Sequence, residues 1–113
     1  MDDKVKRVLL KIREHSLSII NETAGLNTAE EFKNNNDKSK AALFDLMQIG
    51  ELAKDGLSRD TIANTPNIPW KQIYNLRNRI VHGYASVDYQ IIFETIQDDI
   101  PKLVGDIDAA LLE

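Results

Sequence analysis

The chain has 113 residues and a formal net charge of −4, and its 42% hydrophobic and 28% charged residues are typical of a soluble globular domain. The absence of cysteine excludes disulfides and thiolate metal sites, and two histidines, His15 and His82, are too few for a zinc site in one chain. No apolar run approaches the ~20 residues that span a bilayer, and the Met-Asp-Asp start is unlike a secretory signal, so we expect one cytoplasmic domain over residues 1–113 with no metal, cofactor or membrane anchor.

Apolar residues recur at intervals of three and four from Asp2 to about Thr23, which predicts an amphipathic helix that Gly25 ends. The apolar stripe consists of Val5, Val8, Leu9, Ile12, Ser16, Ile19 and Ile20. His15 lies at the edge of this stripe, where a role in packing or at the surface is expected.

A second long helix is expected after a short one. Thr28-Ala-Glu-Glu has the form of a capping box that opens a turn of helix, which should fail at the run of three asparagines from Asn34. Asp37 can then cap a helix that runs to about Lys54 and is apolar on more than one face, so it is expected to be buried between neighbours or between subunits. Glu51 is a carboxylate within it, either solvated at the rim or paired with an arginine.

Two further helices complete the chain. A short helical turn or loop over 60–66 precedes Pro69, which suits the first position of a third helix that ends at Gly83. Residues 87–112 have the periodicity of a final long helix, which Pro101 must kink or split. Its aspartates are expected to form a solvated face rather than a metal site. With no strand pattern, the fold class is all-α, an antiparallel bundle of four to five helices.

The third helix carries local positive charge in an acidic protein. No Asp or Glu lies between Asp60 and Asp88, and the interval contains Lys71, Arg77 and Arg79. Positive charge that is confined to one segment indicates an anion site rather than a general coat for nucleic acid.

Arg77 falls in the middle of the apolar sector of this helix, which consists of Trp70, Ile73, Ile80 and Val81. Because desolvating an unpaired guanidinium is costly, Arg77 is either clamped by a carboxylate, for which Glu51 is the candidate, or lines a cleft that binds an anion. His82 lies about 140° around the ideal helix from Arg77. The two side chains can converge only if the helix unwinds at Gly83 or if two chains bring their copies together.

A histidine that exchanges its proton near neutral pH, close to a fixed cation, suits phosphodiester chemistry. In RNA the 2′-hydroxyl can attack its own phosphate, and the reaction needs a base, an acid and a group that holds the developing charge, but no metal. From the residues alone, a capped helix end with satisfied polar groups remains an alternative.

The pattern Arg-x4-His-x-Tyr, here Arg77, His82 and Tyr84, with Asn78 after the arginine, resembles the signature of HEPN domains of the HepT-like group. The similarity extends over nearly the whole chain in the expected order, through Met-Gln-Ile-Gly-Glu in the second helix, Pro69-Trp70, and a final helix interrupted by Pro101.

This resemblance implies a homodimeric HEPN bundle in which the motifs of both chains line a shared cleft. It implies a metal-independent ribonuclease toxin of a prokaryotic cytoplasm that cleaves RNA such as tRNA or mRNA. His82 would be the acid and base, and Arg77 would hold the phosphate. Asn78 would orient one of them, and Arg79 would contribute charge toward the substrate.

The resemblance also implies a partner, a minimal nucleotidyltransferase antitoxin that neutralises the toxin by binding and by transferring AMP to Tyr84. That transfer would add bulk and negative charge beside Arg77 and His82. An alternative function is a non-catalytic subunit that binds a nucleotide or a nucleotidyltransferase through the same cleft. A further alternative is a bundle that only dimerises.

Overall fold

The computed structural model describes residues 1–83 and 86–112, and this part of the chain forms helices and turns without strands. The elements are α1 (Asp3–Thr23), α2 (Ala29–Asn34), α3 (Asn36–Gly56), α4 (Arg59–Asn64), α5 (Trp70–His82), α6 (Tyr89–Glu94), the π-helical turn η2 (Thr95–Asp99) and α7 (Ile100–Leu111). The predicted all-α bundle is therefore confirmed.

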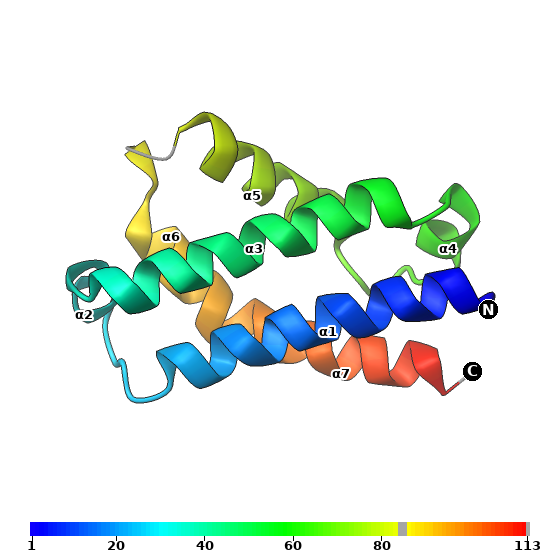
Figure 1. Ribbon diagram of the computed structural model, residues 1–113, viewed down its shortest axis with the longest axis horizontal. Coiled ribbons are helices and arrows are strands. Elements are labelled where there is room, and N and C mark those ends of the chain that lie inside the picture. The colour runs from blue at the N-terminus through cyan, green and yellow to red at the C-terminus, as the bar shows by residue number, and fades with distance from the viewer. Residues whose placement is uncertain (84–85, 113) are drawn as a thin grey trace.

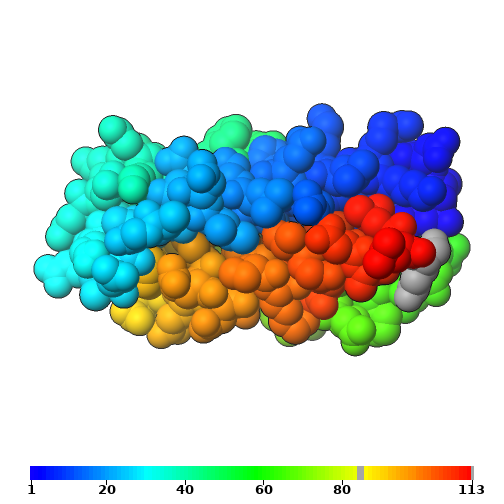
Figure 2. Space-filling view, turned by 90° about the horizontal axis from the view of Figure 1, so that it is seen from below, coloured from blue at the N-terminus to red at the C-terminus, as the bar shows by residue number. Residues whose placement is uncertain are grey.

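The four long segments are arranged as a bundle around α1 and α3. These two helices lie side by side and antiparallel, α5 packs on α3, and α7 packs on α1 (Figure 1). From below, α1 runs along the surface formed by η2 and α7 (Figure 2). The short α2 and α4 lie at opposite ends of the molecule (Figure 1). Helix α5 packs mainly against α3.

Helix α1 matches its prediction closely. The Asp2 side chain accepts a hydrogen bond from the Val5 amide at 2.9 Å and caps the first turn. Gly25, with φ of +91°, follows the last turn in the left-handed conformation that favours glycine. The predicted apolar stripe is largely buried, and Leu9, Ile12 and Ile19 have no exposed surface.

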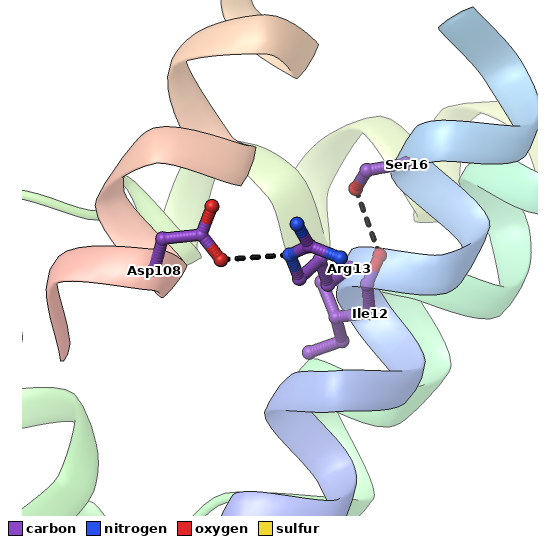
Figure 3. Close-up of polar contacts among 4 residues, drawn as sticks. All are labelled: Ile12, Arg13, Ser16 and Asp108. Atoms are coloured by element: carbon purple, nitrogen blue, oxygen red, sulfur yellow. Dashed lines mark hydrogen bonds and ion pairs between the residues drawn. The ribbon is translucent and has the colours of Figure 1, made fainter. Parts of the chain in front are cut away.

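Polar side chains of α1 form contacts with neighbouring helices and within α1 itself. Arg13 Nε donates to Asp108 Oδ1 of α7 at 2.7 Å, and the Ser16 hydroxyl donates to the Ile12 carbonyl within α1 at 2.8 Å (Figure 3). His15 Nδ1 lies 2.8 Å from Oδ1 of the buried Asp45 on α3. His15 therefore lies at the α1–α3 contact, where it gives a buried carboxylate a partner.

The start of α3 differs from its prediction. Asn35, and not Asp37, is the cap, since its side-chain oxygen accepts from the Lys38 amide at 3.2 Å. Asp37 lies inside the first turn, where its negative charge interacts favourably with the positive end of the helix dipole. The all-round burial expected of α3 is also incomplete within one chain, because Phe44 is 53% exposed.

The final helical segment continues through Pro101 by way of a π turn. The Ile100 amide donates to the Thr95 carbonyl, five residues earlier, immediately before the proline that has no amide hydrogen. The expected interruption is thus a π turn between α6 and α7, where the chain bends (Figure 1).

Candidate functional site

Helix α5 positions the arginine–histidine segment. Its start is fixed by Trp70, a buried residue whose indole nitrogen donates to Thr65 Oγ1 at 2.9 Å. Its end is fixed at Gly83, whose amide donates to the Arg79 carbonyl at 3.0 Å. His82 is therefore the last residue of the helix and is exposed.

Arg77 faces α3 and is mostly buried, with 17% of its side chain exposed. Its Nη2 forms an ion pair with Glu51 Oε1, and its Nη1 donates to Asn78 Oδ1 at 2.7 Å. Its Nε is buried without an acceptor in the described part of the chain. The predicted Glu51 partner is thus present, and Asn78 orients the guanidinium.

Gly50 brings α3 and α5 into close contact at this point. A Cβ atom placed on Gly50 would overlap Cβ and Cγ of Arg77, so only glycine allows the arginine stem to lie against α3. Gly50 is not among the site residues predicted from the sequence. The available signal was a glycine inside a predicted apolar helix, one residue before Glu51.

His82 and Arg79 lie together elsewhere. They line one cavity beside the C-terminal end of α5, with Leu76, Ile80, Gly83, Ser86, Val87, Asp88, Ile91 and Ile92. Arg77 does not line this cavity. The structure therefore forms two groups on one helix: Arg77 with Asn78 and Glu51, and Arg79 with His82. The angular separation expected from the helical wheel is observed, and the helix does not unwind before Gly83.

Three other expectations from the sequence concern Tyr84, metal binding and membrane-spanning helices. Tyr84, the expected acceptor of AMP, lies outside the described residues. Over 1–83 and 86–112, no three His, Asp or Glu side chains are grouped to hold a metal ion, and Asp106 and Asp108 are paired with Lys102 and Arg13. No helix in these ranges is long and apolar enough to cross a membrane.

The chain is similar to a known protein family and to several individual proteins. The family model described as "Ribonuclease HepT-like" matches residues 13–109. The chain is similar to "Putative RNase MJ1380" of Methanocaldococcus jannaschii, at 31% identity over 92% of this chain and 94% of that protein. It is also similar to "Putative RNase MJ0127" of the same organism, at 32% identity over 92% of this chain and 84% of that protein.

A third relative covers less of the chain. "Probable ribonuclease HepT" of Thermococcus cleftensis is 35% identical over 50% of this chain and 51% of that protein. No solved structure matches the chain at a significant level.

Proposed function

This chain belongs to the HepT-like ribonuclease family, and from that membership we propose that it is a metal-independent endoribonuclease of a toxin–antitoxin pair. The observation that carries the mechanism is the separation of Arg77 from His82 along α5. Within one chain the Arg77 guanidinium lies against α3, and His82 lines a cavity that does not include Arg77. A catalytic pair then needs Arg77 from one chain and His82 from a second copy.

In this mechanism His82 removes the proton from the RNA 2′-hydroxyl and then, as imidazolium, protonates the leaving 5′-oxygen. Arg77 stabilises the negative charge that develops on the phosphate oxygens. Glu51 and Asn78 fix the direction of the guanidinium before substrate arrives, which lowers the cost of ordering it in the transition state. A base, an acid and a charge-stabilising group are thereby supplied by protein side chains.

The surface that best suits the second copy is the α3–α5 face. The Glu51–Arg77 ion pair and the placement of Lys54 Nζ 5.5 Å from the Tyr74 ring centre show that α3 and α5 run antiparallel. Phe44 therefore lies toward the His82 end of α5.

Two exposed apolar side chains occur on this face. Phe44 shares a side of α3 with Glu51, seven residues on, and Val81 shares a side of α5 with Arg77, four residues before. They are 53% and 44% exposed. Burying them between two copies would bring the ends of the two α5 helices together.

The direct test of nuclease activity is incubation of the purified protein with RNA in EDTA. Wild type should cleave, and Arg77→Ala and His82→Ala should each reduce the rate at least a hundredfold. Arg7→Ala, which removes an exposed cation from α1, serves as the control and should cleave like wild type. Cleavage that persists in both active-site variants would rule out this assignment.

The neutralised charge of Arg77 favours a second candidate, a non-catalytic subunit that binds a nucleotidyltransferase or a nucleotide. In this case Arg77, paired with Glu51 and Asn78, would join α3 to α5 and would not contact a phosphate. Under this alternative the protein would bind the nucleotidyltransferase or ATP tightly and would leave RNA intact in the same EDTA assay.

A further inference from the structure

A groove runs along α5 between this helix and the α6–η2 segment, and α3 contributes to its floor. It consists of two adjoining cavities that share Leu76, Arg79 and Ile91. One cavity, of about 430 Å³, contains His82, and the other, of about 260 Å³, extends along η2. Each is close to the lower end of the range in which proteins hold small organic groups, roughly 300–1,000 Å³.

The lining combines an apolar floor with polar rims. The floor of the η2 cavity includes the buried side chains of Leu46, Ile49 and Ile100, and Ile73, Leu76 and the more exposed Ile91 complete its apolar lining. Gln72 and Asn75 border it on α5, and Thr95 and Asp99 border it on η2. An apolar floor with amide and carboxylate groups at the edge fits a flat ring whose perimeter carries hydrogen-bonding groups.

Charge is distributed unevenly along the groove. Arg79 lies where the two cavities meet, and no carboxylate of residues 1–83 or 86–112 is within ion-pair distance of its guanidinium. Asp99 lies in the η2 cavity, which does not include His82. Asp88, in the His82 cavity, is engaged in accepting the Gln90 and Ile91 amides that begin α6. An anion is therefore favoured near Arg79 and an amino group near Asp99.

The π turn η2 forms part of the cavity lining. The Ile100 amide bonds to the Thr95 carbonyl, and Thr95 and Asp99, the first and last residues of the turn, lie four apart on one face and both line the cavity. Such turns occur frequently at functional sites.

From this arrangement, and on the basis of the ribonuclease function proposed above, we propose that the groove binds an unpaired nucleobase of the RNA substrate. The base lies on the apolar floor, its phosphate contacts Arg79, and its exocyclic amino group donates to Asp99. Single-stranded RNA is commonly read through bases that leave the stack in this way. The groove selects a base that carries an amino group, such as cytosine, over uracil, and places the adjoining phosphate on the side of His82.

The test uses 2′-O-methyl RNA decamers, which cannot undergo the cleavage reaction, and measures binding by fluorescence anisotropy. Wild type should bind oligo(C) roughly tenfold more tightly than oligo(U), the size of one good base contact. Asp99→Ala should remove this preference. Asp98→Ala, the adjacent exposed carboxylate that does not line the groove, should keep it. Asn75→Trp, which fills the groove, should weaken oligo(C) binding about tenfold, and Gln97→Trp outside it should not.

Equal binding of the two decamers by wild type, a retained preference in Asp99→Ala, or wild-type affinity in Asn75→Trp would each overturn the base site. If Asn75→Trp instead loses only its binding to the nucleotidyltransferase, the groove receives protein and the proposal is also wrong. Failure of the nuclease function has a different signature: wild type would bind oligo(C) with the expected preference and leave unmodified RNA uncut.

Discussion

At the residue scale, the proposed chemistry depends on how Arg77 is held. Its guanidinium is mostly buried and has a carboxylate on one nitrogen and an amide oxygen on another. A guanidinium with this little exposure is tolerated because its charge is paired. The helical wheel left two interpretations open, a clamp by a carboxylate such as Glu51 or a cleft that binds an anion, and the ion pair corresponds to the first. Gly50 was not predicted, because the need for a missing Cβ arises only where α5 crosses α3.

Removing the carboxylate should therefore destabilise the protein. Glu51→Ala leaves the buried guanidinium with one hydrogen-bond acceptor, and we expect the free energy of unfolding in urea to fall by roughly 1–3 kcal/mol. Asp106→Ala breaks the more exposed pair with Lys102 and should lower the free energy of unfolding by only about 0–1 kcal/mol. Equal effects of the two substitutions would mean that the Arg77–Glu51 pair contributes no more than a surface contact.

Tyr84 is predicted to regulate the site rather than to act in it. Tyr84→Phe should keep RNA cleavage close to wild type, because neither the acid–base group nor the charge holder is changed. Incubated with the proposed nucleotidyltransferase antitoxin and ATP, the wild-type chain should gain mass in units of AMP, and Tyr84→Phe should not. Mass spectrometry that shows the same gain in Tyr84→Phe would place the modification on another residue.

At the element scale, the helices could be predicted from apolar periodicity and capping residues, whereas two local features could not. Asn35 competes successfully with Asp37 as the cap of α3, a choice between neighbouring side chains that periodicity does not resolve. Pro101 indicated an interruption but not its form, since a π turn depends on how α6 and α7 pack on their neighbours. Two residues of this turn, Thr95 and Asp99, line the groove.

The contact between α3 and α5 can be tested with a pair of glycine substitutions. Gly50→Ala should push α5 away from α3, because the new methyl group would overlap the Arg77 stem, and should lower the free energy of unfolding by about 1–3 kcal/mol. Gly105→Ala has open space around the new methyl group and should raise the free energy of unfolding by about 0.5–1 kcal/mol. A stabilised Gly50→Ala protein would contradict the close approach of these helices.

At the scale of the whole molecule, the single chain leaves its proposed catalytic groups apart and an apolar face uncovered. The bundle architecture followed from the sequence, but the exposure of Phe44 did not, because a helix that is apolar on several faces can be covered by its own chain or by another. Within one chain the neighbouring helices cover only part of α3, which makes the α3–α5 face the surface that we propose for dimerisation.

The proposed interface predicts a monomer when charge is placed on it. Phe44→Glu should shift the molecular mass measured by light scattering from two chains to one and should abolish RNA cleavage, since each site needs two copies. Leu10→Glu alters a similarly exposed apolar residue on α1 and should remain dimeric and active. A Phe44→Glu protein that is still dimeric would move the interface to another face.

The most direct test of a site shared by two copies is complementation between inactive chains. Arg77→Ala and His82→Ala, expressed together with different tags and purified as the mixed dimer, retain one complete pair: Arg77 from the second variant and His82 from the first. We predict that the mixed dimer cleaves RNA at about half the rate of a wild-type dimer, because one of two symmetric sites survives. A mixed dimer as inactive as either parent, beside an active wild-type dimer carrying the same tags, would contradict the shared site.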